Sequence, residues 1–92
     1  MENDWIQGVV IKVINGNTFL LKSNLVNDEH SNRIYQQIEQ IRISGISAGD
    51  PTKYEGILAK NRLRARIENR KVQCTVLSRE SDNALLCTVI II

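Results

Sequence analysis

Apolar residues alternate with polar ones near the start of the chain and predict a first strand from Trp5 to Ile14. Such alternation is typical of a strand with one buried face, because successive side chains point to opposite faces. The side chains expected to share the buried face are Val9, Ile11 and Val13, with Lys12 on the other face.

A tight turn and a returning strand are predicted next. Asn15-Gly16 lies between apolar segments, and this pair favours a short hairpin because both residues tolerate positive φ. The returning strand is expected over Thr18 to Lys22. The polar segment from Ser23 to Asn32 then predicts a mobile loop.

The middle of the chain predicts a third strand and a helix. β-Branched residues favour a strand from Ile34 to Ser44, and the segment from Ser47 to Lys53 predicts a loop. A helix is expected from Tyr54 to Asn69. Its narrow apolar stripe, with residues spaced at i, i+4 and i+8, consists of Ala59, Leu63 and Ile67.

Two strands are predicted at the end, from Lys71 to Leu77 and from Ala84 to Ile92, joined by a turn over Ser78 to Asn83. Centring the hairpin on that turn places three apolar pairs on one face. These predicted pairs are Val72 with Val89, Cys74 with Cys87, and Val76 with Leu85. The two cysteines are therefore expected to be neighbouring reduced thiols that behave as small hydrophobic residues.

The predicted order, β-β-β-α-β-β, is that of the five-stranded OB-fold barrel, a mainly β (α+β) fold with its helix between strands 3 and 4. The pattern alone leaves other small α+β folds open. Ninety-two residues, 42% of them hydrophobic, predict a single domain over residues 1–92. The longest apolar run, Cys87 to Ile92, is too short to span a bilayer, and the N-terminus has no apolar signal region. A cytoplasmic location without membrane contact is therefore expected.

Charge is concentrated in one segment, although the net charge is only +2. Lys53 to Lys71 holds seven basic residues against two acidic ones, a surplus of five. With Leu63 at the centre of the buried helix face, the cations fall on both flanks. Lys60, Arg64 and Lys71 lie on one flank, and Arg62, Arg66 and Arg70 on the other. This split favours a solvated helix, and the alternative is a nucleic-acid-binding surface.

The segment Gln40 to Asp50 (QIRISGISAGD) resembles the strand-to-loop segment of the thermonuclease (staphylococcal nuclease-like) family, Arg-Leu-x-Gly-Ile-Asp-x-Pro-Glu. Val10 to Thr18 resembles its first hairpin, Val-x-Asp-Gly-Asp-Thr. Tyr54 to Val76 resembles its Tyr-Gly-x-x-Ala helix and the following Lys-Val-x-Val strand, with one extra residue before Ala59. The resemblance implies an OB barrel, a calcium site and phosphodiester hydrolysis.

The residues at the family's site positions differ from the family pattern. The resemblance places the two metal-binding aspartates at Asn17 and Ser47, the general-base glutamate at Asp50 and the first catalytic arginine at Arg42. No arginine follows Arg79 to match the second catalytic arginine, and the family's C-terminal helices have no counterpart in this sequence. The calcium site is therefore predicted to be lost, leaving no catalytic residues and no cofactor.

Three hypotheses for the function stay open. The first is a non-catalytic OB module that binds nucleic acid weakly, through residues Arg42, Lys60, Arg62, Arg64 and Arg66. The second is a protein-interaction or structural module, which could dimerise through the apolar run Ile90-Ile91-Ile92. The third is a residual metal-dependent nuclease.

Other single residues have competing interpretations. Arg42 is either a retained phosphate contact or an arginine on a strand edge that is solvated or paired with Glu39 or Asp50. Phe19 and Tyr35 could stack on bases, as OB-type binders require, or belong to the core. His30 has no metal-ligating partner at a suitable spacing, so it is expected to be a surface residue.

Overall fold

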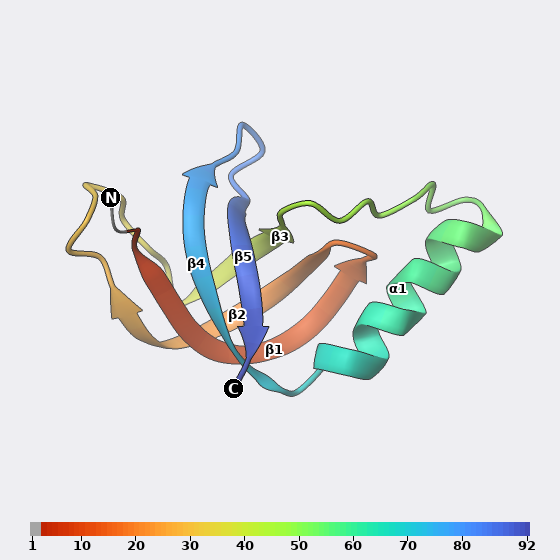
Figure 1. Ribbon diagram of the computed structural model, residues 1–92, viewed down its shortest axis with the longest axis horizontal. Helices are drawn as coiled ribbons and strands as arrows, with labels where there is room; N and C mark the ends of the chain where they lie inside the picture. Colours follow the sequence, from red (N-terminus) through yellow and green to blue (C-terminus); the bar gives the residue numbers. More distant parts are fainter. Residues whose placement is uncertain (1–2) are drawn as a thin grey trace.

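The computed structural model of the protein describes residues 3–92. Over this range the chain forms a barrel with one helix beside it (Figure 1). The elements are β1 (Trp5–Asn15), β2 (Thr18–Asn27), β3 (Ile38–Ile43), α1 (Tyr54–Ile67), β4 (Lys71–Arg79) and β5 (Leu85–Ile91). The order β-β-β-α-β-β is the predicted one.

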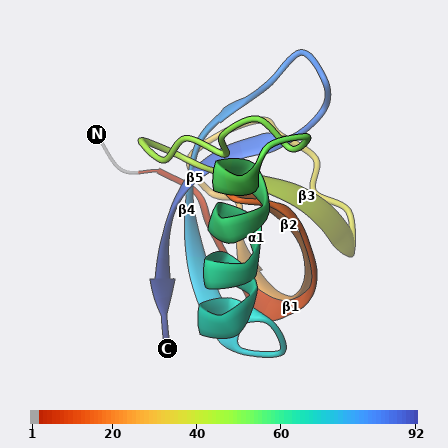
Figure 2. The same cartoon turned by 90° about the vertical axis from the view of Figure 1, so that its right-hand side faces the viewer.

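The sheet is a closed barrel with the strand order β1-β2-β3-β5-β4, in which β4 returns to pair with β1. The pairs are antiparallel except β3 with β5, which run parallel from Ile41↔Leu85 to Ile43↔Cys87. The helix stands at one side of the barrel, against β1 (Figure 2). This arrangement confirms the predicted five-stranded OB barrel.

The core is formed by the inward side chains of all five strands, with one contribution from the helix. Its fully buried members from the strands include Ile6, Val10, Phe19, Leu21, Ile41, Val72, Cys74, Val76, Leu85 and Cys87. From α1, Ile67 is buried and Leu63 packs against the core. Ala59 is half-buried, so the predicted helical stripe does face the barrel.

The predicted inward face of β1 is wrong in part. Val13 is buried as expected, whereas Val9 and Ile11 are exposed, and Ile6 and Val10 fill the core instead. The register against β2 shifts between Val10 and Lys12, which marks a bulge. An extra residue in one strand reverses the side-chain alternation beyond it, so a simple period of two assigns the wrong face before the bulge.

The boundary between β2 and β3 also differs from the prediction. β2 continues to Asn27 through the segment predicted as a loop, because Trp5 to Gln7 of β1 pair with its far end. β3 begins only at Ile38, and Ile34 lies outside it and is exposed. Pairing with the long first strand overrides the polar composition of Ser23 to Asn27.

The predicted register of the last hairpin is wrong by two residues. Cys74 lies opposite Val89, and Cys87 lies opposite Val76. A bulge between Val76 and Ser78 and a turn closed by a hydrogen bond from Glu80 N to Ala84 O (2.7 Å) shift the pairing. A shift of two keeps every side chain on its own face, so both cysteines stay buried, and both are free thiols.

The helix is shorter than predicted and ends at Ile67. Glu68 is extended and Asn69 has a φ of 65°, so the chain turns away before Arg70. Asn69 N then donates to Val10 O (2.8 Å) and ties the end of the helix to β1.

At the start of the helix, a Cβ on Gly56 would lie 1.9 Å from Asp50 O, so only glycine permits this close approach.

In the part of the chain that the structure describes, no helix is long and apolar enough to cross a membrane.

Candidate nucleic-acid interface

The residues that the resemblance assigns to a thermonuclease site lie in the β1–β2 turn, near the end of β3 and in the loop after β3. Asn17, in the β1–β2 turn, donates from Nδ2 to Ile46 O (2.9 Å) and accepts a hydrogen bond from Thr18 Oγ1 (2.8 Å). Its amide therefore ties the hairpin to the loop after β3. In this structure Asn17 is a structural link, with both ends of its amide used.

Ser47 and Asp50 organise local turns in the loop from Ser44 to Lys53. Ser47 Oγ accepts from Gly49 N (3.3 Å), and Asp50 Oδ1 accepts from Thr52 N (2.9 Å) and Thr52 Oγ1 (2.7 Å). The hydrogen bonds from Thr52 lower the pKa of Asp50 below its usual value. Both residues are exposed.

The donor set does not fit a calcium ion. Calcium takes six to eight oxygen ligands, with carboxylates among them. Asn17 and Ser47 are neutral, and Asp50 is the one carboxylate among these positions. Within residues 3–92, no group of three or more His, Cys, Asp or Glu side chains could hold a metal ion.

Arg42 reaches from β3 to the β4–β5 loop. Its Nη2 lies 2.6 Å from Asp82 Oδ2, and its Nη1 lies 3.5 Å from Glu80 Oε1. The hydrogen bond with Asp82 raises the pKa of Arg42 and lowers that of Asp82. The expected pairing with Glu39 or Asp50 is therefore wrong, because closure of the barrel places Arg42 beside Leu86, at the start of β5.

Glu39 has a different arginine, which the sequence analysis missed. Arg79 Nη1 lies 2.8 Å from Glu39 Oε1, and Arg79 Nη2 donates to Ile34 O (2.9 Å). The carboxylate is only 3% exposed and also accepts from Gln36 N (2.7 Å). Hydrogen bonding to it raises the pKa of Arg79. A signal was present, because Glu39 and Ile41 alternate onto the same buried face, where a charge requires a partner.

The cations of α1 have no such partners. In the described part of the chain, no carboxylate forms an ion pair with Lys60, Arg62, Arg64 or Arg66. Arg62, Arg64 and Arg66 are exposed, and Lys60 is half-buried. Their charges are therefore available to an external anion.

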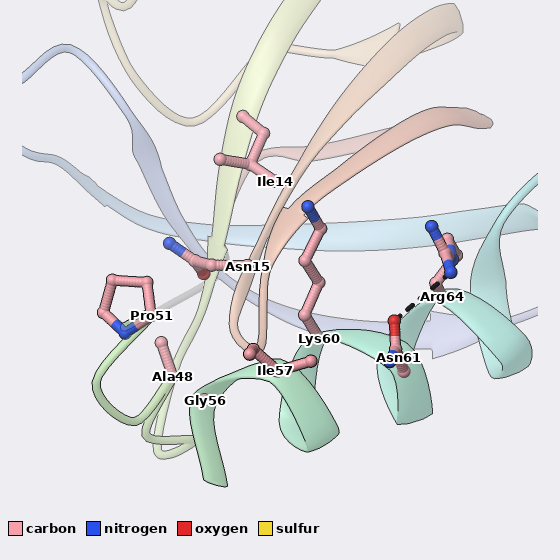
Figure 3. Close-up of a pocket in the computed structure, with 9 residues that line it drawn as sticks. All are labelled: Ile14, Asn15, Ala48, Pro51, Gly56, Ile57, Lys60, Asn61 and Arg64. Atoms are coloured by element: carbon pink, nitrogen blue, oxygen red, sulfur yellow. Dashed lines mark hydrogen bonds between the residues drawn. The ribbon is translucent and has the colours of Figure 1, made fainter. Parts of the chain in front are cut away.

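A cleft of about 240 Å³ runs along one flank of the helix (Figure 3). Lys60 and Arg64 line it from α1, and Ile14 and Asn15 line it from the end of β1. Arg64 Nη2 donates to Asn61 Oδ1 (3.2 Å), a contact drawn as a dashed line in Figure 3. Two cations one helical turn apart, together with the two asparagine amides, form a cleft that can accept a phosphate group.

The opposite flank carries Arg62 and Arg66. They line a second cleft of about 210 Å³ with Gly16, Ile46 and Ser47. The four cations within α1 are therefore divided between the two flanks, as the helical periodicity predicted. One short row of positive charge therefore lies on each side of the buried stripe of the helix. The placement of Arg70 and Lys71 on these flanks is wrong, because the helix ends at Ile67 and Lys71 begins β4.

The aromatic residues considered for base stacking are occupied elsewhere. Phe19 is fully buried in the core. Tyr35 lies outside β3, and its hydroxyl donates to Asp4 Oδ2 (2.5 Å). Tyr54 is 77% exposed at the first position of α1, close in sequence to the helix cations.

Asp4 forms a second site that the sequence analysis missed. It is 1% exposed and accepts hydrogen bonds from His30 N (2.9 Å), Ser31 Oγ and Tyr35 Oη. Burial alone would raise the pKa of Asp4, but these hydrogen bonds outweigh it and lower the pKa, while burial and the bond to Asp4 raise the pKa of Tyr35. The cluster fastens the loop after β2 to the start of β1. The sequence carries no signal for it, since Asp4 precedes the first apolar run, and His30 itself is exposed as predicted.

No protein-family model matches the chain, and the search of curated proteins found no match. The resemblance to thermonucleases therefore stays a hypothesis that rests on the motif residues.

Proposed function

We propose that the protein is a non-catalytic, nuclease-like OB module that binds nucleic acid weakly through the cations of α1. One observation carries the proposal. Lys60, Arg62, Arg64 and Arg66 have no carboxylate partner among the described residues, whereas Arg42 is held by Asp82 and Glu80. Unpaired cations on one element are the electrostatic footprint of a phosphate-binding surface.

Because Arg42 is paired and the helix cations are not, we place the proposed contact on α1 and not at the mouth of the barrel. OB folds commonly bind ligands across strands 2 and 3 and the loops at that mouth. Here Asp82 and Glu80 place negative charge in the β4–β5 loop beside Arg42, which disfavours a phosphate there. The helix, with its unpaired cations, is the better surface for a polyanion.

The proposed binding is weak and insensitive to sequence. Arginine and lysine contacts to phosphates position a protein on nucleic acid but do not read bases. Tyr54 is one exposed aromatic residue on the same helix, whereas high-affinity single-strand binders stack bases on several aromatic residues. If all four cations contact phosphates, the logarithm of the affinity falls with the logarithm of salt concentration with a slope of roughly −3 to −4.

The experiment is fluorescence anisotropy with labelled single-stranded and duplex oligonucleotides at two salt concentrations, with and without calcium. We expect an affinity that falls steeply as the salt concentration rises and that is unchanged by calcium. The variant Lys60→Ala/Arg64→Ala should lower the salt slope by about two, while Arg42→Ala should leave it unchanged.

Two outcomes would overturn parts of the proposal. An absence of binding at high protein concentration would reject the nucleic-acid contact. Calcium-dependent cleavage of the oligonucleotide that is lost in Arg42→Ala would reject the non-catalytic assignment and support the residual nuclease.

A further inference from the structure

The second half of β5 has an open edge. The parallel pairing with β3 ends at Ile43↔Cys87, and the last bond on that side runs from Ser44 N to Cys87 O (2.8 Å). On its other side β5 stays paired with β4 as far as Ile91. Beyond Cys87 the strand therefore has one neighbour instead of two.

The backbone groups on this edge follow from the alternation of an antiparallel ladder. Ile92 N donates to Lys71 O (3.0 Å), so Ile92, Ile90 and Thr88 direct their backbone groups toward β4. Val89 and Ile91 then direct their N–H and C=O groups to the open side. A strand edge of this kind is a template for a further strand.

An apolar groove lies directly beside the open edge. It has a volume of about 300 Å³ and runs between the end of β5 and α1. Leu63 and Ile67 line it from the helix, and Val89 and Ile91 line it from the strand. Ile91 belongs to the core-facing row of β5 yet is 41% exposed. Figure 2 shows this last part of β5 running beside α1 and ending near the level of the helix's last turn.

The charge at the rim indicates the kind of partner. Arg66 is the one charged residue lining the groove, and it has no ion pair in the described structure. A second copy of the chain, paired through β5 about a twofold axis, would bring a second Arg66 into the interface and no carboxylate from the groove lining to balance either charge. An acidic partner would instead neutralise this charge.

We infer that the open edge of β5 and the groove beside α1 bind an extended peptide segment of another protein, with alternating apolar side chains and a carboxylate at one end. The segment adds a strand to β5 through the backbone of Val89 and Ile91. Its apolar side chains enter the groove, and its carboxylate pairs with Arg66. This mode draws affinity from main-chain hydrogen bonds and specificity from the groove. It shares Arg66 with the proposed nucleic-acid contact, whereas the open edge of β5 and the apolar side chains of the groove take no part in that contact.

The test uses the peptide acetyl-Asp-Val-Thr-Val-Thr-Val-Thr-amide and amide hydrogen exchange followed by NMR. In the free protein the amides of Val89 and Ile91 are expected to exchange rapidly, and saturating peptide is expected to protect both. The amide of Ile90, which faces β4, is the internal control and should be protected in both states.

Matched variants separate backbone pairing from charge. Ile91→Pro removes the open-edge donor without breaking a bond to β4 and should weaken binding about tenfold, while Ile91→Val should bind like the wild type. Arg66→Glu should weaken binding of the acidic peptide about tenfold and improve binding of the peptide with Lys in place of Asp. Arg64→Glu, on the opposite flank, should change neither.

Three results would overturn the inference. The first is no protection of Val89 and Ile91 at millimolar peptide. The second is equal binding by Ile91→Pro and Ile91→Val. The third is protection that grows with protein concentration in the absence of peptide, which would assign the edge to a second copy of the chain.

Discussion

The arginines of the barrel and the cations of the helix differ in one respect. Arg42 and Arg79 are each bound to carboxylates from strands or loops distant in sequence. Lys60, Arg62, Arg64 and Arg66 have none within residues 3–92. The pair of Arg79 with the buried Glu39 stabilises the barrel, whereas the exposed pairs of Arg42 contribute little stability but occupy its charge, and the unpaired cations of the helix are available to bind. Stability and binding should therefore respond to different substitutions.

The largest effect on stability is expected from Glu39→Ala. The substitution leaves Arg79 without its carboxylate and Gln36 N without an acceptor. Removing one partner of a largely buried pair should lower the free energy of unfolding by about 3 kcal/mol. Urea denaturation measures it, with Glu55→Ala on the exposed helix as the control. Equal effects of the two substitutions would show that the barrel pair is no different from surface charge.

A smaller loss is expected from Asp4→Asn. The amide group places a donor where three donors require an acceptor, so the free energy of unfolding should fall by about 2 kcal/mol. The effect should also depend on pH. Because the pKa of Asp4 is lowered in the folded protein, its contribution is complete above the unfolded value of 3.8 and is lost as pH falls through the folded value.

Unfolding measured from pH 7 to pH 2 tests this pH dependence. The wild type and Asp4→Asn should converge in stability at the acid end of the range. The pKa of Asp82 is also lowered, so both proteins should still lose some stability as the pH falls. A difference between them that is constant with pH would exclude the ionised carboxylate as the cause.

Removal of the two carboxylates that pair with Arg42 should leave its guanidinium available to bind a phosphate. Asp82→Asn/Glu80→Gln removes both carboxylates from its guanidinium. Oligonucleotide binding should strengthen, and the salt slope should steepen by about one, because a further phosphate contact becomes available. The change in stability should be small, since this pair is solvent-exposed. If Arg42→Ala weakens binding by the otherwise wild-type protein as much as Arg64→Ala does, the comparison fails.

The smallest change in stability is expected on the helix. Arg62→Ala and Arg64→Ala should each leave the free energy of unfolding within about 0.5 kcal/mol of the wild type, because neither residue has a charged partner in the described chain. Thermal denaturation measures this, and anisotropy on the same samples should show weaker oligonucleotide binding. A large loss of stability would mean that these side chains cover apolar surface and would explain their presence without a ligand.

The sequence by itself determined the elements and their order. Alternation located the five strands except for the end of β2 and the start of β3. Asn15-Gly16 located the first turn, and the stripe of Leu63 and Ile67 located the helix and its buried face. These signals are local, because a strand or helix expresses its burial in the spacing of a few consecutive residues. The division of the helix cations between two flanks followed from the same periodicity.

Only the tertiary structure decided the registers and the charge partners. A bulge near Ile11 shifts the pairing of β1 with β2, and one near Leu77 shifts the pairing of β4 with β5; such bulges are common at the rims of barrels. Arg42 meets Asp82, 40 residues away, because β3 and β5 pair in parallel at the point of closure. The edge of β5 is open because β3 ends before it does. Each of these contacts joins distant segments, and no local pattern records which residues closure brings together.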